Sequence, residues 1–380
     1  MVVVVNSIIS NIKRLDKVLC IAWILAIISA FFIHPDRTYI SYIDFRSLGI
    51  LWGLMVIIQG LKENSVFERI AIALLSKVKN GFELAVVLVF MCFIGSMLIT
   101  NDVALITFVP LAIMILSSCK REDLMIPVVV LQTIAANLGS MLTPIGNPQN
   151  LYLYGLTGMK LSSFILTMLP YSLISAALLF ACLFTLPGRK EKLSNTKENS
   201  ITSRFGSKIQ IIIYAVLFAI ALLTVVRVIP WYVFAIIVLV VVGGMDFKIL
   251  LRADYILLLT FIGFFIFTGN MGRIDYISDF LGTVLTDREF AIGVVLSQFI
   301  SNVPATLMLS GFTTNYTSLL VGVNVGGLGT LIASMASLIS FKAYTKEFPY
   351  NTGKYFGMFT LANILFLIVL VGFRIAISFF

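Results

Sequence analysis

SMLITNDVALITFVP (residues 96–110) is an apolar run that is interrupted at its centre by Thr-Asn-Asp. SQFISNVPATLML (residues 297–309) is an apolar run that is interrupted in the same way by Ser-Asn. A glycine-rich segment with threonine follows each of them: ANLGSMLTPIGNPQNL (136–151) and VNVGGLGTLIASMASL (323–338). A helix that runs through apolar sequence is interrupted at each of these four places, and these interruptions therefore set the predicted architecture.

Composition places the chain in a membrane. Of the 380 residues, 59% are hydrophobic and 12% are charged, and the mean hydropathy is +1.04. Apolar runs long enough to cross a bilayer recur from end to end, which predicts an all-α polytopic protein of the plasma membrane. The net charge of +9 arises mainly from bases in loops, as the positive-inside rule requires, so we expect no nucleic-acid partner.

The two interruptions predict re-entrant hairpins. The apolar arms at 84–99 and 103–118 have 16 residues each, whereas a perpendicular span needs about 20. A re-entrant hairpin over about 83–118 therefore fits better than two full spans. The second arm, 290–300, has only 11 residues before the interruption, which is roughly 16 Å of helix or half a membrane. The second hairpin is expected over about 290–313.

The glycine-rich segments predict broken helices. Pro144, Gly146 and Pro148 make a continuous helix improbable. We expect one broken helix over about 124–156 and its partner over about 317–342. The expected domains are an N-terminal helix with the first repeat (1–187), a cytoplasmic linker (188–208) and a second repeat (209–380).

The two halves match at three places with the same order and internal spacing. The matched pairs are the segments that begin at Asp44 and Asp254, Ile99-Thr100-Asn101 with Ile300-Ser301-Asn302, and Asn137-x-Gly139 plus Thr143 with Asn324-x-Gly326 plus Thr330.

The positive-inside rule orients the repeats. It places the N-terminus in the cytoplasm and the C-terminus outside, with the second repeat inverted relative to the first. Inverted repeats with broken helices at matching positions are typical of secondary transporters that bind solute at the midplane. Two hairpins of full spans would leave the flanking loops on the same sides, so charge favours the inversion without testing re-entry.

Hairpin tips and broken helices supply free N–H groups, which favour anions, and free carbonyls, which favour Na⁺. The residues predicted to bind substrate are Asn101, Asp102, Ser140, Thr143, Asn302, Val303 and Thr330. Those predicted to couple the ion are Thr100, Asn101, Asp102, Gly139, Asn147, Ser301, Asn302 and Gly326. A Na⁺ site is possible at Thr100, Asn101 and Gly139.

Asp102 is the only carboxylate deep in an apolar stretch, and an intramembrane acid indicates function. It is expected to carry a proton or bind a cation, although an acid at this position can also cap a helix. No Lys or Arg lies in the matching core sequence. A polyanion would therefore need bound cations or a protonated Asp102.

These residues resemble the ion transporter superfamily, which contains divalent anion/sodium symporters, citrate-transporter-like proteins, arsenite permeases and sodium/proton antiporters. The segment 139–150 closely follows the Gly-Gly-x-x-Thr-x-Ile-Gly-x-Pro-x-Asn pattern of the symporters, whereas its partner keeps Gly326-Gly327 but has Ala333-Ser334-Met335 in place of Gly-x-Pro. Both tips keep Asn and a hydroxyl but lack the third-position Thr of the symporters, and Asn-Asp is more similar to the arsenite-permease side. The resemblance implies a scaffold with a mobile transport domain (an elevator), a homodimer, solute bound between the tips, and Na⁺ or H⁺ coupling.

We therefore expect a secondary active transporter that moves a small inorganic or carboxylate anion with Na⁺ or H⁺. A Na⁺/H⁺ antiporter and an arsenite or oxyanion efflux permease are the alternatives. No nucleophile–base or metal constellation indicates an enzyme, and no G-x-x-x-x-G-K-[ST] loop indicates an ATPase. The expected partners are a small solute, the bilayer and a second copy of the chain, with no cofactor beyond the coupling ion.

Overall fold

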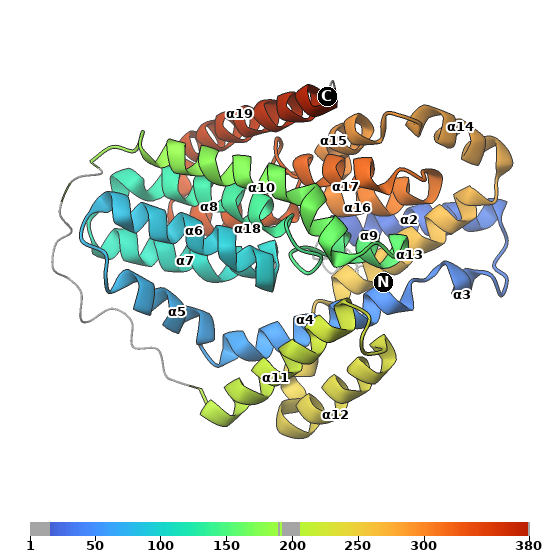
Figure 1. The fold of residues 1–380 in the computed structure, drawn as a ribbon, viewed down its shortest axis with the longest axis horizontal. Coiled ribbons are helices and arrows are strands. Elements are labelled where there is room, and N and C mark those ends of the chain that lie inside the picture. Colours follow the sequence, from blue (N-terminus) through green and yellow to red (C-terminus); the bar gives the residue numbers. More distant parts are fainter. Residues whose placement is uncertain (1–15, 189–190, 192–205, 379–380) are drawn as a thin grey trace, which may run out of the picture.

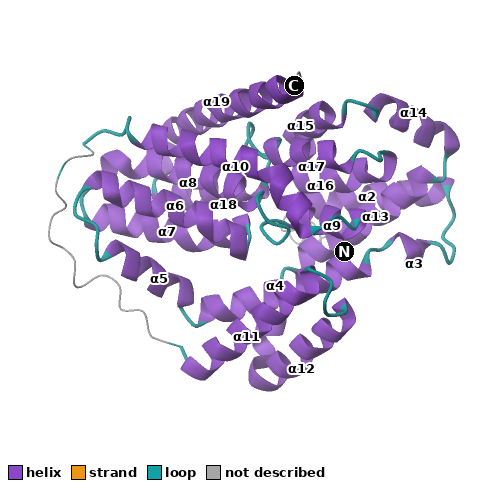
Figure 2. Ribbon diagram, viewed as in Figure 1, coloured by secondary structure: helices purple, strands orange, loops and turns teal. Residues whose placement is uncertain are grey.

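The computed structural model describes residues 16–188, 191 and 206–378, and within them the chain forms helices and no strands (Figures 1 and 2). Nine of the described helices are long and apolar enough to cross a membrane. The chain is therefore an integral multi-pass membrane protein, as predicted. The predicted linker 188–208 falls largely at 189–190 and 192–205, which lie outside the described residues.

One group of helices, here called the frame, is held by close helix contacts. Gly49 and Gly53 lie one turn apart on α4 and face the rings of Trp231 and Phe234 on α12, because residues without a side chain let helix backbones approach. On the opposite side of the frame, Asn270 of α13 donates to Ser29 Oγ of α2 at 2.9 Å. The frame consists of α2 (Lys17–Phe32), α4 (Phe45–Glu63), α11 (Lys208–Val225), α12 (Trp231–Leu250) and α13 (Tyr255–Gly272).

The second group, here called the core, contains both polar interruptions. Each half contains a break between two helices, at residues 141–147 in the first half and 326–334 in the second. Within each half, a hairpin of two helices packs on the helix that precedes this break. The first half contributes α6 (Gly81–Ile99), α7 (Asn101–Ser118), α8 (Met125–Ser140) and α9 (Pro148–Thr157). The second half contributes α15 (Glu289–Ile300), α16 (Asn302–Leu309), α17 (Tyr316–Val325) and α18 (Met335–Glu347).

The two halves of the core interlock. α18 of the second half packs against α7 and α8, while α9 of the first half packs against α16 and α17 (Figure 1). The frame is exchanged in the same way, since α2 packs on α13 and α12 packs on α4. Each half of the chain therefore completes the other, and neither half is a separate layer.

Shorter and peripheral helices complete the fold. α5 and α14 each place apolar residues on one side and polar residues on the other. α10 and α19 pack against each other and both cover α8. The remaining bounds are α3 (Tyr39–Tyr42), α5 (Val66–Leu75), α10 (Leu161–Leu183), α14 (Asp275–Leu285) and α19 (Thr352–Ser378).

The first hairpin is longer than its apolar arms suggested. α6 and α7 have 19 and 18 residues and both qualify as spans by length. The reason is local: Asn80 caps α6 by accepting from the N–H of Glu83, and a single residue, Thr100, makes the turn between the two helices. α15 and α16 have only 12 and 8 residues. Re-entry of the hairpins and inversion of the repeats remain predictions.

Candidate functional site

Each hairpin turns at a single residue with an unusual backbone. Thr100 has φ 71° and ψ 151°, and Ser301 has φ 76° and ψ 153°. This region is nearly reserved for glycine and costs about 1–3 kcal/mol for other residues, so it persists only where the surroundings enforce it. The two tips therefore share one strained conformation, although they lie on opposite halves of the chain.

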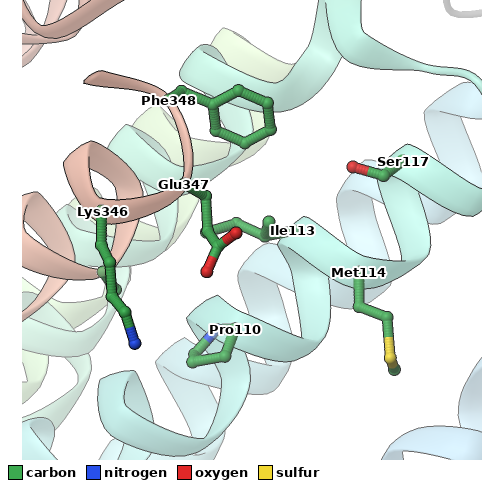
Figure 3. Close-up of a pocket in the computed structure, with 8 residues that line it drawn as sticks. Pro110, Ile113, Met114, Ser117, Lys346, Glu347 and Phe348 are labelled. Atoms are coloured by element: carbon green, nitrogen blue, oxygen red, sulfur yellow. The ribbon is translucent and has the colours of Figure 1, made fainter.

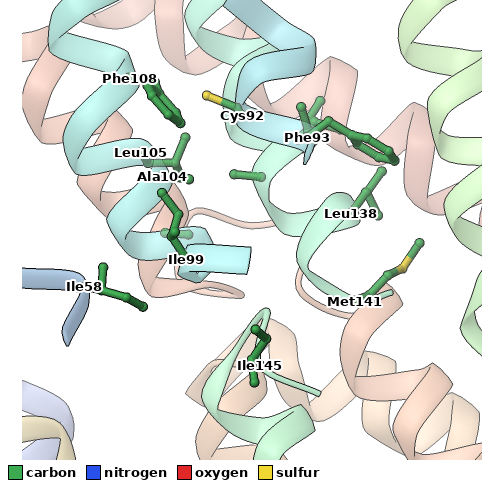
Figure 4. Packing of buried hydrophobic residues seen from close by; sticks show 14 of the residues in the cluster. Ile58, Cys92, Phe93, Ile99, Ala104, Leu105, Phe108, Leu138, Met141 and Ile145 are labelled. Carbon is green, nitrogen blue, oxygen red and sulfur yellow. The ribbon is translucent and has the colours of Figure 1, made fainter. Parts of the chain in front are cut away.

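Each tip is fixed to the break of its own half. The N–H of Asn101 donates to Gly146 O and the N–H of Asn302 donates to Ala333 O, both at 3.0 Å. The hydroxyl of Thr143 also donates to Met97 O at 2.5 Å. Figure 4 shows the apolar packing around the first tip, with Ile99 between α7 and the break.

The second tip has the matching contact, because the Thr330 hydroxyl donates to Gln298 O at 3.0 Å. In this structure the hydroxyls of Thr143 and Thr330 bond to the first arm of each hairpin, and their binding of substrate stays a prediction. Asn101 and Asn302 cap the helices that follow them: their Oδ1 atoms each accept from the next N–H at 2.9 Å.

Asn137 joins the two halves at the centre of the core. Its Oδ1 accepts from Ser334 Oγ at 2.9 Å and from Asn101 Nδ2 at 3.3 Å. Its Nδ2 lies 3.4 Å from Ser337 Oγ and 3.5 Å from Gly327 O. The end of α8 in the first half is thereby bonded to the start of α18 in the second.

Asn324, which matches Asn137 in the sequence repeat, makes the mirrored connection. Its Oδ1 accepts from Asn147 Nδ2 at 3.0 Å, and its Nδ2 donates to Asn150 Oδ1 at 2.7 Å. The four asparagines of these connections are all buried, namely Asn137, Asn147, Asn150 and Asn324. The end of α17 is thereby hydrogen-bonded to the start of α9. Hydrogen bonds therefore connect the break of each half to a helix of the other half.

The sequence prediction missed four members of this network, namely Asn137, Asn150, Asn324 and Ser334. The signal was present, because Asn137 and Asn324 were aligned in the repeat and Asn150 belongs to the glycine-proline pattern. Most predicted residues lie on or beside the network, namely Thr100, Asn101, Asp102, Ser140, Asn147, Ser301, Asn302 and Val303.

Gly139 and Gly326 have a packing role. A methyl group at Gly139 would overlap the backbone at Phe93 and lie 2.6 Å from Ser96 Oγ, and one at Gly326 would lie 2.9 Å from Ser297 Oγ. The carbonyl of Gly139 accepts from the N–H of Leu142 at 3.1 Å. Both glycines bring the end of a helix close against the first arm of its own hairpin.

Two polar groups of the site have no protein partner. Asp102 is half-buried in the first turn of α7, and among the described residues nothing forms a hydrogen bond to its carboxylate. Gln149 lies in the first turn of α9 with 1% of its surface exposed, and neither atom of its amide is bonded. Buried groups of this kind are usually satisfied by water or ligand.

A cavity of about 100 Å³ lies at the boundary between frame and core. It reaches the second tip at Val303 and Pro304, and it carries the carboxylates of Asp16 and Asp254 from the frame. A larger pocket of about 520 Å³ lies elsewhere, between the C-terminal ends of α7 and α18 (Figure 3). That pocket contains no residue of the predicted site.

Comparison with known proteins identifies the family. The family model described as citrate transporter matches residues 5–316. The chain belongs to the citrate transporter family. This member is 33% identical to an uncharacterized transporter, MJ0456, of Methanocaldococcus jannaschii over 90% of this chain and 92% of that protein. It is 29% identical to the inner membrane protein YbiR of Escherichia coli over 83% and 84% of the two chains.

A more distant similarity covers part of the chain. The silicon efflux transporter LSI3 of Oryza sativa subsp. japonica is 30% identical over 36% of this family member and 28% of that protein. Membership of the family, together with the helices that can cross a membrane, makes this chain a membrane transporter that acts on small solutes within a lipid bilayer.

Proposed function

We propose that this citrate transporter family member is a secondary active transporter that moves a small inorganic or carboxylate anion together with Na⁺ or H⁺. The solute binds where the two tips meet the two breaks. The hydrogen-bonded asparagines support this proposal. Asn137 and Asn324 occupy matching positions, and each connects its own half of the chain to the other half near the tips and the breaks. We further propose a homodimer in the plasma membrane, with a cytoplasmic N-terminus and the C-terminus outside.

The lining explains why a cation must accompany an anion. Amides and hydroxyls line the two breaks, and Asp102 adds a negative charge. Among the described residues of this network there is no Lys or Arg. An unpaired charge is expensive inside a membrane, so an anion at this point requires Na⁺ or a proton to balance it. Asp102 is the group that would bind the cation or hold the proton.

The elevator mechanism is supported by a mismatch between frame and core. α13 packs along α16, but in the described residues α4 makes no comparable packing against α7, the matching helix. Conversely α4 packs on α9, while α13 makes no comparable packing against α18. A core that sits centrally in the frame would make both kinds of contact equally. In the proposed movement, the observed arrangement is one end, and exchanging the contacts describes the other.

The size of the movement follows from the register of α4. Gly155 at the outer end of α9 now faces Ser47. The exchanged arrangement brings Ser47 level with Asp102, near Gly146, since the first tip is bonded there. The core would slide by the nine positions that separate Gly146 from Gly155, seven of them inside α9, which is at least about 10 Å at 1.5 Å per residue.

Paired cysteines test this movement. Thr260 and Pro304 line one cavity in the present state, and their matches in the first half are Ile50 and Val103. We expect Thr260→Cys with Pro304→Cys to cross-link readily in a background without the four native cysteines. Ile50→Cys with Val103→Cys should cross-link only when the core has moved, at a rate that solute changes. A core fixed in the frame would never give the second cross-link.

Thermal stability of purified protein tests the solute and the coupling ion. A bound solute stabilises the folded state by mass action, about 2.7 kcal/mol at a hundredfold excess over Kd. We expect sulfate, phosphate, succinate or citrate to raise the melting temperature only with Na⁺ or at lower pH, and Asp102→Asn to abolish that dependence. Asp279→Asn on α14, whose residue is exposed, is the matched control.

The same panel separates the alternatives. A response to Na⁺ or pH without any anion effect would identify a Na⁺/H⁺ antiporter. A response to arsenite or silicic acid alone would favour oxyanion efflux, which the partial similarity to a silicon efflux transporter supports. Amides and hydroxyls can bond the hydroxyl groups of such solutes as both donors and acceptors.

A further inference from the structure

The outer end of α9 is held by an arginine of the frame. α9 ends at Gly158, which has φ 65°, and the last carbonyls of a helix have no partner inside it. Arg227, in the loop between α11 and α12, donates from Nη1 to Gly158 O at 2.6 Å and from Nη2 to Tyr154 O at 2.9 Å. Its guanidinium also lies 5.2 Å from the centre of the Tyr154 ring. A cation at a helix C-terminus is favoured by the helix dipole.

A second arginine of the frame contacts the same turn. Arg46, in the first turn of α4, donates to Gly155 O at 3.4 Å. Gly155 allows this approach, because a methyl group there would lie 2.9 Å from Ser47 Oγ. The hydrogen bonds of both guanidinium groups to α9 go to backbone carbonyls, and the Tyr154 ring adds a side-chain contact to Arg227, so the contact depends mainly on the position of α9.

We propose that Arg46 and Arg227 form a latch that holds the core at this end of its travel. α9 belongs to the core, whereas both arginines belong to the frame. A shift of at least about 10 Å along α9, at 1.5 Å per residue, carries the carbonyls of Tyr154 and Gly158 away from both arginines. The contact therefore exists in one state only and biases the equilibrium toward it. This inference rests on the proposed elevator movement.

The latch is one-sided in the sequence. By the repeat alignment, Ile256 stands at the position of Arg46 and Lys342 at the position of Gly155. When the matched surfaces of α13 and α18 meet at the other end of the travel, the Arg46 contact has no counterpart. The predicted topology places the latch at the extracellular face, so the state that it favours is open toward the cytoplasm.

The experiment combines latch variants with the two cysteine pairs. Arg227→Gln in the full-length protein is expected to raise the rate of the Ile50–Val103 cross-link roughly ten- to a hundredfold, the range expected for losing hydrogen bonds to a charged group. The Thr260–Pro304 cross-link should slow. Arg46→Gln should act in the same direction with a smaller effect, because its hydrogen bond is longer.

Arg273→Gln is the matched control. Arg273 is a partly exposed arginine that is bonded to Asp36 at 2.8 Å, and both residues adjoin frame helices, so we expect neither cross-link rate to change. Arg227→Lys keeps the charge without the paired hydrogen bonds and should fall between wild type and Arg227→Gln. It also serves if Arg227→Gln does not fold.

Two outcomes overturn the latch, and they differ. If Arg227→Gln lowers the melting temperature but leaves the ratio of the two cross-links unchanged, Arg227 only caps α9. If the Ile50–Val103 cross-link forms in no variant under any solute, the core does not move and no state exists to be held. Solute-dependent uptake into proteoliposomes, measured on the same preparations, then shows whether transport itself survives.

Discussion

Asn324→Leu is expected to reduce solute uptake into proteoliposomes at least tenfold and to lower the melting temperature. The substitution removes the only hydrogen-bond partner that the structure gives to Asn150 Oδ1 and leaves Asn147 Nδ2 with one long bond, at 3.3 Å, to Ser140. Each buried group left without a partner costs about 1–3 kcal/mol. Because these residues connect the break of one half to the helix of the other, the solute site should lose its geometry as well as its stability.

Asn363→Leu is the matched control for this variant. Asn363 is also fully buried, but it lies on α19 and donates to the carbonyl of Phe359 in its own helix. Its Oδ1 has no partner, so leucine removes an unsatisfied group. We expect normal uptake and an unchanged or higher melting temperature. Equal loss of uptake in both variants would mean that the asparagine network has no special role.

Gly139→Ala is expected to destabilise the fold strongly, because the added methyl meets backbone of a neighbouring helix. The new methyl would overlap the backbone carbonyl of Phe93, which cannot move aside as a flexible side chain can. Overpacking of this kind costs about 1–3 kcal/mol and sometimes more. The end of α8 would be pushed from α6, displacing Ser140 and the break. The melting temperature and uptake should both fall.

Two other glycines calibrate that result. Gly357→Ala on α19 meets nothing within 4 Å and should be neutral or stabilising, because alanine favours a helix by about 1 kcal/mol. Gly326→Ala should be intermediate, since its nearest neighbours lie 2.9 Å from the added methyl. Melting temperatures that fall in the order Gly357→Ala, Gly326→Ala, Gly139→Ala would support the argument that close packing excludes a side chain at Gly139. A Gly139→Ala protein as stable as wild type would refute it.

The helices and their ends were accessible from sequence because they depend on local chemistry. Apolar runs that are bounded by charges predicted the spans, and the prolines and glycines after Gly139 predicted the break before Pro148. Asp44 and Asp254 begin matching helices by accepting from an N–H three residues later, at 3.0 Å in both cases. The apolar arms of the first hairpin were counted as shorter than its helices, because a turn of one residue, Thr100, could not be expected of a threonine.

The candidate site was accessible only in part. The tips were found because polar residues inside apolar runs are visible in any single segment. The hydrogen bond of Thr143 to Met97 and the packing of Gly139 against Phe93 were not visible in the sequence, because both are contacts with another helix. Asn137 and Ser334 are nearly two hundred positions apart, and no local pattern indicates that they form a hydrogen bond.

A helical membrane protein with two related halves, each with a polar tip and a broken helix, could be predicted from the order of the residues alone. These features follow from hydrophobicity, backbone preference and repetition, which act over a few residues. The way in which the halves interlock, with α9 against α16 and α18 against α7, could be seen only in the three-dimensional structure. The three-dimensional structure also decided which side of the frame the core approaches, because packing and buried hydrogen bonds depend on how surfaces far apart in the chain fit together.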